Sequence, residues 1–246
     1  MIKYTLVYPY YRQPETFRRH VQNWASWPEF ILRSFQFVVV DDCSPEPLPL
    51  EGLPLPPNFS AFRVKDDIRW NYGAKNLGIS MALAPWVILS EFDHLLPRNM
   101  AMQLWHVKPW PEFYYQFLRY NNDKTADSRY SDRPHRASLL MPTAAFWQAG
   151  GIEEDFCGHY GHDDSYLHDC LQAIGLKPKT LAARFGKLWN LSKHANFPDA
   201  ELHGRIPQDW YDLSVNQKIY EAKRDTGQPS RRWLRFAWER TYPAYA

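Results

Sequence analysis

Two carboxylates, Glu91 and Asp93, close an apolar run in the segment ILSEFDHLLP (residues 88–97), and His94 follows them directly. Side chains two residues apart on an extended chain point to the same side, so one ion can contact both carboxylates. A hard divalent cation such as Mg²⁺ or Mn²⁺ prefers carboxylate oxygens together with the phosphate oxygens of a substrate. The same pattern also fits a loop with two solvated acids, and the motif alone leaves both interpretations open.

Two other segments carry polar residues next to apolar runs. In VVVDDCS a buried-strand pattern runs into Asp41 and Asp42, whose carboxylates can accept hydrogen bonds from a ribose or a base. A strand-end Asx turn is the alternative. RWNYGAKNLG lacks the Gly-Lys-Ser/Thr of a phosphate-binding loop. Its glycines, with Asn71 and Lys75 at a helix start, still allow the backbone to approach a diphosphate.

The segment GGIEEDFCGHYGHDDSYLHD combines glycines, acids and histidines. Asp163 and Asp164 fall at a predicted helix start, where free N–H groups and the helix dipole favour carboxylates. His159, His162, Asp163 and His168 raise the question of a zinc site, but the segment has neither a Cys pair nor an HExxH pattern, so zinc is not favoured. His194, in LWNLSKHANF, is a lone histidine, which is more often structural than a ligand.

Apolar periodicity in the first half of the chain alternates between strands and helices. Strand patterns cover residues 2–8, 35–41, 59–64 and 86–91. Helix-period stripes predict helices over residues 14–26 and 72–84. Strands that alternate with helices predict a parallel α/β sheet, whose ligands bind beyond the carboxyl ends of the strands. The acidic pairs at 41–42 and 91–93 fall at those ends.

The second half is less regular. Strand patterns cover residues 112–120 and 137–142, and helix patterns cover 143–150 and a segment beginning at the Asp163–Asp164 pair. From about residue 205 a basic tail follows, with one helix expected over 209–224. Near its end, basic and aromatic residues alternate in a way that could stack nucleic-acid bases or rest on a membrane face: Arg231, Arg232, Trp233, Arg235 and Trp238. A solvated amphipathic end is the alternative.

Composition narrows the functional class. The chain has 246 residues and a formal net charge of +2, so no strong electrostatic attraction to nucleic acid is implied, and no nucleic-acid partner is expected. Its three cysteines have no CxxC spacing, which indicates a reducing compartment. No run of about 18 apolar residues is present. We therefore expect a soluble, cytoplasmic protein with at most peripheral membrane contact through its tail.

Taken in order, these segments resemble a GT-A glycosyltransferase of the family 2 type, with a second half similar to the β-1,4-galactosyltransferase group. The resemblance rests on TLVYPYYRQPETF, VVVDDCS, NYGAKNLG, ILSEFDHLLP and GGIEEDFCGHYGHDDSYLHDCLQAIG, and it covers about residues 3–195. It implies a single GT-A domain with a Rossmann-like, mixed, mainly parallel sheet flanked by helices. The domain would span residues 1–204, as a nucleotide-binding half (1–97) and an acceptor and catalytic half (98–204), followed by a helical basic tail (205–246).

The resemblance also assigns roles to individual residues. The nucleotide would be held by Pro9, Tyr10, Arg12, Asp41, Asp42, Asn71 and Lys75. A Mn²⁺ or Mg²⁺ ion would be held by Glu91, Asp93 and His194. Asp163 matches the catalytic base. The donor and acceptor sugars would contact Tyr160, Gly161, His162 and Asp164.

The implied activity is metal-dependent, inverting transfer of a hexose (galactose, GalNAc or glucose) from a UDP-sugar to a hydroxyl of a glycan or another acceptor. Two departures from the family pattern concern the site. Glu91 replaces the first aspartate of the metal motif, and His162 replaces the glutamate before the catalytic aspartate. They motivate an alternative, a catalytically inactive nucleotide-sugar or glycan-binding module on the same fold.

Overall fold

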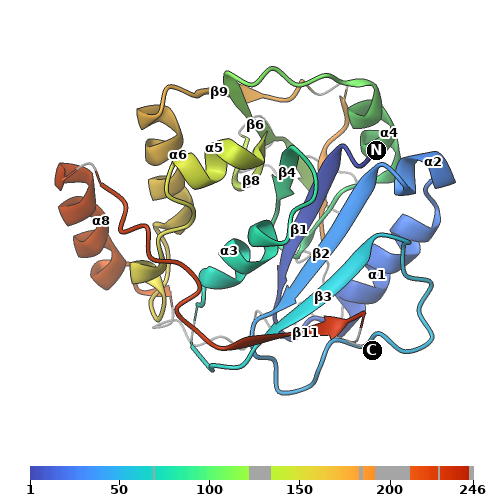
Figure 1. Ribbon diagram of the computed structural model, residues 1–246, viewed down its shortest axis with the longest axis horizontal. Helices are drawn as coiled ribbons and strands as arrows, with labels where there is room; N and C mark the ends of the chain where they lie inside the picture. The colour runs from blue at the N-terminus through green and yellow to red at the C-terminus, as the bar shows by residue number, and fades with distance from the viewer. Residues whose placement is uncertain (69, 122–133, 183–184, 192–210, 227, 244–246) are drawn as a thin grey trace.

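The computed structural model describes residues 1–68, 70–121, 134–182, 185–191, 211–226 and 228–243. At its centre is an eight-stranded sheet in the order β11-β3-β2-β1-β4-β8-β6-β9 (Figure 1). In chain order, the strands are β1 Tyr4–Tyr10, β2 Phe35–Asp41, β3 Phe59–Val64, β4 Trp86–Leu89, β6 Phe113–Phe117, β8 His135–Pro142, β9 Lys177–Thr180 and β11 Trp238–Tyr242. β1 to β4 are parallel neighbours, whereas β8 and β11 run antiparallel to the strands beside them. This mixed, mainly parallel sheet confirms the predicted fold class.

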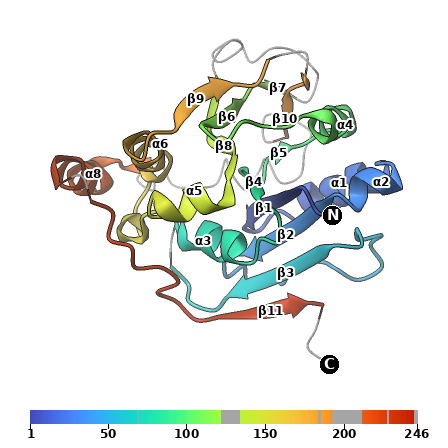
Figure 2. The same ribbon diagram turned by 45° about the horizontal axis from the view of Figure 1, so that its top comes forward.

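Helices cover both faces of the sheet (Figures 1 and 2). One face carries α1 Pro14–Ala25, α2 Glu29–Leu32 and α4 Arg98–His106; the other carries α3 Gly73–Ser80, α5 Thr143–Gln148 and α6 Asp163–Ala173. Burial follows this division. Phe17 and Trp24 of α1 belong to one buried apolar cluster, whereas Leu77 of α3 and Phe146 of α5 belong to the other.

α3 presents a glycine, Gly78, to the sheet. A Cβ atom at Gly78 would lie 2.3 Å from Cγ1 of Val7 in β1. The absent side chain lets the helix pack directly on β1, which brings its amino end, with Lys75, to the carboxyl edge of the sheet. The helix ends at Ser80, earlier than the predicted 84.

A second, three-stranded sheet stands beside the main one, in the order β5-β10-β7. Its strands are β5 His94–Leu95, β7 Arg119–Asn121 and β10 Leu188–Asn190. The prediction of one continuous strand over residues 112–120 is therefore wrong. The chain leaves the main sheet after Phe117, and Arg119 opens a strand of the small sheet, because β7 pairs with β10 rather than with β8.

The described part of the tail contains the α-helix α8 (Ser214–Thr226) and also β11, which pairs with β3 and extends the main sheet. Trp233 donates its indole N–H to the Gly150 carbonyl at 2.6 Å, and the Arg235 guanidinium lies 2.8 Å from the Asp155 carboxylate. These two residues, which belonged to the nucleic-acid hypothesis, thus contact the chain itself. Within the described ranges no helix combines the length and apolar character needed to cross a membrane.

His20 of α1 is fully buried against the rings of Tyr8, Trp24 and Phe92, and its Nε2 lies 2.7 Å from the Phe92 carbonyl oxygen. Burial lowers the pKa of this imidazole from 6.5 to about 4. The folded chain therefore keeps His20 neutral at pH values where the unfolded chain protonates it. Protonation of His20 therefore favours the unfolded chain. We expect it to lower the unfolding free energy by roughly 3 kcal/mol as the pH falls from above 6.5 to 4.

Urea unfolding at pH 7 and pH 4 measures this loss, with His20→Gln as the comparison. Glutamine keeps a donor for the Phe92 carbonyl but does not titrate. Between the two pH values the wild-type chain should lose roughly 3 kcal/mol more than the variant. Equal losses in the two chains would contradict the predicted neutral state of His20.

Candidate active site

The acidic residues predicted to act on a ligand lie at one edge of the main sheet. β1, β2 and β4 run in the same direction, and their last residues, Tyr10, Asp41 and Leu89, all lie at the carboxyl edge. The amino ends of α3 and α6 meet at this edge through an ion pair of Lys75 with Asp163. The edge thus collects residues from five separate segments of the sequence: β1, β2, β4, α3 and α6.

The centre of the site is a buried ion-pair cluster. The Lys75 ammonium donates to Oε1 of Glu91 at 2.8 Å and to Oδ2 of Asp163 at 2.7 Å. The Lys75 side chain is only 6% exposed, whereas that of Glu91 is 35% exposed. One lysine therefore joins the predicted metal-binding strand end to the predicted catalytic helix.

Burial and charge oppose each other in this cluster. Burial alone would lower the pKa of Lys75, but Asp163 and Glu91 together raise it well above its ordinary value, so the ammonium stays charged. Burial raises the pKa of the Asp163 carboxyl above its usual value, although the Lys75 ammonium pulls it back down. Asp163 is thus a carboxylate of increased basicity, and the neighbouring cation favours its ionised form.

The loop before α6 fixes the position of Asp163. Its backbone is left-handed at Gly161 (φ 87°) and His162 (φ 69°), immediately before the helix begins. The Tyr72 hydroxyl accepts a hydrogen bond from the Gly161 N–H at 2.6 Å. The fully buried Asn216 of α8 donates to three carbonyl oxygens of the loop, that of Gly161 among them at 2.9 Å. Tyr72 and Asn216 are positioning residues that the sequence did not indicate.

Asp93 lies next to a histidine pair. Its Oδ1 is 2.5 Å from Nδ1 of His94, and the His94 ring stacks on His135 with 4.2 Å between centroids. A guanidinium nitrogen of Arg119 lies 3.2 Å from Nε2 of His94. Because Arg119 can only donate, Nε2 accepts, and Nδ1 carries the proton that it donates to Asp93. Arg119 and His135 had no signal in the sequence, whereas His94 was visible only as a neighbour of Asp93.

Glu91 and Asp93 supply the hard oxygen ligands that Mg²⁺ or Mn²⁺ takes alongside substrate phosphates. Both stay partly open to solvent, and the Asp93 side chain is 21% exposed. The third predicted ligand, His194, lies outside the described residues. Within the described residues no group of three His, Cys, Asp or Glu side chains could hold a metal. The described residues thus contain two of the three predicted metal ligands, each with an ion-pair partner in the chain, Lys75 for Glu91 and His94 for Asp93.

Asp41, the last residue of β2, and Asp42, which follows it, make different contacts. Oδ1 of Asp41 accepts a hydrogen bond from the Ser44 N–H at 2.9 Å, and its other oxygen lies 3.8 Å from Arg63. Asp41 thus makes the strand-end turn that was the alternative interpretation. Asp42 is held by its backbone N–H, which donates to the Tyr10 carbonyl at 2.8 Å. Burial and the charge of Asp41 raise the pKa of the Asp42 carboxyl well above its ordinary value.

Three buried polar atoms at this end of β2 lack a hydrogen-bond partner among the described residues: Oδ2 of Asp41, Oδ1 of Asp42 and Nδ2 of Asn71. The Asn71 amide orientation is set by its Oδ1, which accepts from the Gly73 N–H at 3.0 Å. The backbone of Asn71 hydrogen-bonds the Asp42 carboxylate, so the two residues are neighbours. These atoms keep hydrogen-bonding capacity that the described residues do not use.

The residues predicted to frame the base come from the end of β1. The Tyr10 ring is buried against Phe17 and Phe92, so only the backbone of this residue faces the edge. Pro9 is half-buried in the same strand. Arg12 is exposed, has a left-handed backbone (φ 52°), and donates its N–H to the Ser44 hydroxyl at 3.0 Å.

The residues predicted to contact sugars occupy different surroundings. The Tyr160 ring lies 5.1 Å from Trp70 and 4.9 Å from Tyr211, and these three half-buried rings form an aromatic cluster near Asp163. The sequence did not single out Trp70 or Tyr211. His162 instead stacks on Tyr220 of α8, with 5.0 Å between ring centroids.

The side chains of Asp164 and His168, both on α6, hydrogen-bond with other residues of the chain. Oδ1 of Asp164 accepts a hydrogen bond from the Ser165 N–H at 2.6 Å. The buried His168 lies 2.9 Å from the Tyr114 hydroxyl and 2.9 Å from the Arg136 carbonyl oxygen. Both ring nitrogens of His168 are therefore occupied, which agrees with the low expectation of zinc.

No protein-family model matches the chain, and no curated protein matches it. Solved structures do. Mannosyltransferase PcManGT from Pyrobaculum calidifontis, in complex with GDP-Man and Mn²⁺, is similar with a TM-score of 0.58 and 14% identity, covering 90% of this chain and 68% of that chain.

Two further structures are similar. The catalytic domain of Drosophila β1,4-galactosyltransferase 7, in complex with xylobiose, has a TM-score of 0.52 and 14% identity, covering 85% of this chain and 82% of that chain. TarS 1-349 from S. aureus, in complex with UDP-GlcNAc, has a TM-score of 0.55 and 10% identity, covering 89% of this chain and 66% of that chain. At such identities the likeness shows the fold. The chain has a GT-A fold, as the sequence resemblance implied.

Proposed function

We propose that this chain is a glycosyltransferase that moves a sugar from a nucleotide-sugar donor to an acceptor hydroxyl. The observation that carries the proposal is the cluster of Lys75, Glu91 and Asp163 at the carboxyl edge of a GT-A sheet. It joins the three segments expected to contact the diphosphate, the metal and the acceptor. The donor class is supported by the similar structures, whose names include GDP-Man, UDP-Gal and UDP-GlcNAc.

In the proposed reaction Asp163 takes the proton of the acceptor hydroxyl. The hydroxyl oxygen forms a bond to the anomeric carbon, and the bond from that carbon to the diphosphate oxygen breaks, leaving its electron pair on the diphosphate. A single displacement of this kind inverts the anomeric configuration. Burial favours proton uptake by Asp163, and the Lys75 ammonium favours the ionised carboxylate that can accept the proton.

The metal belongs to the same proposal. Glu91 and Asp93, together with His194, would hold a Mn²⁺ or Mg²⁺ ion, which when bound supplies Lewis-acid stabilisation of the leaving diphosphate. The N–H that His94 donates fixes the orientation of the Asp93 carboxylate. The Lys75 ammonium, 2.8 Å from Glu91, adds positive charge to the same part of the edge.

We propose a UDP-hexose as the donor. A uracil presents one N–H donor between two carbonyl acceptors, which complements the free Oδ1 of Asp42 and Nδ2 of Asn71. The remaining nucleotide contacts would come from Asp41, Arg12 and the Pro9–Tyr10 backbone. Galactose, GalNAc or glucose, and the glycan or other hydroxyl acceptor, would contact Tyr160, Gly161, His162 and Asp164. Trp70 and Tyr211 extend the aromatic surface on which a pyranose ring can stack.

A catalytically inactive nucleotide-sugar-binding module is the second candidate. The ion pair of Glu91 with Lys75 favours it, because this carboxylate must leave a lysine to contact a metal directly. Both candidates predict donor binding, and only the enzyme predicts turnover that depends on Asp163.

Donor binding is tested by calorimetry of UDP, UDP-galactose, UDP-GalNAc, UDP-glucose and GDP-mannose, with and without Mn²⁺. We expect UDP and at least one UDP-sugar to bind in the presence of Mn²⁺, and the Asp93→Ala variant to weaken this binding at least tenfold. Asp169→Asn is the matched control, since Asp169 lies on α6 and accepts from the Tyr220 hydroxyl at 2.6 Å. Binding that Asp93→Ala leaves unchanged would remove the metal from the proposal, and preference for GDP-mannose would remove uracil.

A further inference from the structure

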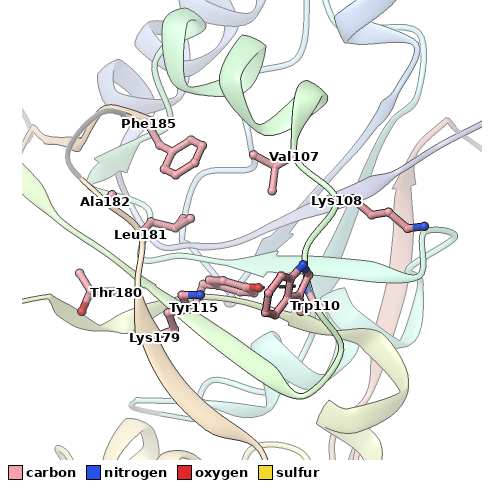
Figure 3. A pocket seen from close by; sticks show the side chains of 9 residues that line it. All are labelled: Val107, Lys108, Trp110, Tyr115, Lys179, Thr180, Leu181, Ala182 and Phe185. Atoms are coloured by element: carbon pink, nitrogen blue, oxygen red, sulfur yellow. Dashed lines mark hydrogen bonds between the residues drawn. The ribbon is translucent and has the colours of Figure 1, made fainter.

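A cavity of about 260 Å³ is lined by residues that follow α4, by residues of β6 and β9, and by residues that follow β9 (Figure 3). One wall belongs to the amino edge of the main sheet, because the hydroxyl of Tyr4, the first residue of β1, donates to the Val107 carbonyl at 3.2 Å. Asp163 and Glu91 lie at the opposite, carboxyl edge. The proposed transfer reaction therefore does not use this cavity.

Three of the nine described residues that line the cavity are aromatic. Figure 3 shows the rings of Trp110, Tyr115 and Phe185 around it. The backbone N–H of Trp110 donates to the Tyr115 hydroxyl at 2.9 Å, and this hydrogen bond fixes the loop that carries the indole. Trp110 is nevertheless 58% exposed, an unusual state for a side chain of this size. A held but exposed indole offers a flat apolar face to a ligand.

The charge of the cavity is positive. Of the nine described residues that line it, two are lysines, Lys108 and Lys179, and none is acidic. The Lys179 ammonium stands 5.2 Å from the Trp110 ring centroid and 4.8 Å from that of Phe113. β9, which carries Lys179, is exposed along its whole length. A lysine ammonium thus lies over the ring of the exposed Trp110, and both residues line the cavity.

We propose that this cavity binds a carboxylated sugar, such as a uronic acid residue of an acidic glycan. The apolar face of a pyranose stacks on Trp110, and its carboxylate pairs with the Lys179 ammonium. Ligand pockets for drug-sized molecules span roughly 300–1,000 Å³, so a cavity of about 260 Å³ matches one sugar unit rather than a chain. The site is independent of the proposed catalytic cluster, and it gives a polymeric ligand a second point of attachment.

Nuclear magnetic resonance titration of the wild-type chain with methyl glucuronide and with methyl glucoside tests the proposal. The two probes differ in their carboxylate. We expect saturable shifts of N–H groups around the cavity with the glucuronide, the Trp110 indole N–H among them in the wild type, and at least tenfold weaker binding of the glucoside. Trp110→Ala and Lys179→Met should each weaken glucuronide binding at least fivefold. Lys218→Met, which removes an exposed lysine from α8, should not change it.

The Asp163→Asn variant should bind the glucuronide like the wild type, which separates this proposal from that of sugar transfer. Equal binding of the two probes, or binding that survives both cavity variants, would overturn the carboxylated-sugar site. So would the absence of saturable binding. A further measurement is sedimentation of the protein with vesicles that contain phosphatidylserine. If the protein sediments with them in a Trp110-dependent way and does not bind the glucuronide, the same aromatic and basic residues belong to a membrane-binding surface instead.

Discussion

Replacing Asp163 by asparagine is expected to lower the turnover of sugar transfer by roughly three orders of magnitude, within the range typical for loss of a general base. Asparagine keeps the shape and the helix-start position of Asp163 but cannot take the acceptor proton. The Lys75 ammonium keeps its second partner, Glu91, so the fold should survive the change. UDP release from the preferred UDP-sugar measures turnover, and calorimetry should show donor affinity within about threefold of the wild type.

Asp169→Asn on the same helix is the control and should retain activity within about twofold. A turnover of Asp163→Asn above about one tenth of wild type would remove Asp163 as the base. Turnover of the wild type that never exceeds that of the variant would support the inactive module. The pH profile gives an independent check. Because burial raises the pKa of Asp163, the acid limb of the wild-type profile should lie above the ordinary titration range of an aspartate.

The parts of the fold that could be predicted from the sequence are those with dense local signals. FQFVVVD and the run at 59–64 are strands with the predicted bounds. The rule that parallel strands collect ligands at their carboxyl ends placed Asp42, Glu91 and Asp93 at one edge. The motif order then predicted a site that would also contain Asp163 and Lys75. The ion-pair cluster agrees with that arrangement, and the roles of its members remain predictions.

The contacts between these motifs could not be predicted. Lys75 reaches Asp163 across 88 residues of sequence, and nothing in NYGAKNLG distinguishes a lysine that binds phosphate from one that pairs with two carboxylates. β11 was missed for a related reason. Its sequence, WERTY, is short and polar, and it becomes a strand because the edge of β3 offers backbone groups to pair with. Both features depend on partners far away in the chain.

Replacing Lys75 by methionine is expected to lower the unfolding free energy at pH 7 by roughly 3–5 kcal/mol, the cost of removing one partner from a buried ion pair. Methionine fills a similar volume but leaves the buried Asp163 carboxylate without its cation. The partly exposed Glu91 can be solvated, so most of the loss should come from Asp163. Without Lys75 the pKa of Asp163 rises further, and the lost stability should return as the pH falls and the carboxyl is protonated.

The double variant Lys75→Met with Asp163→Asn isolates this cause. Both residues of the buried pair are uncharged in this double variant. It should therefore be more stable at pH 7 than Lys75→Met alone, even though it carries one more substitution. Urea unfolding of the wild type, both single variants and the double variant completes a double-mutant cycle, which gives the coupling free energy between Lys75 and Asp163. Additive losses would show that Lys75 and Asp163 are not coupled and would contradict the cluster as the centre of the site. A large favourable coupling would explain why a buried lysine stands between two carboxylates, because it keeps the proposed base charged inside the protein.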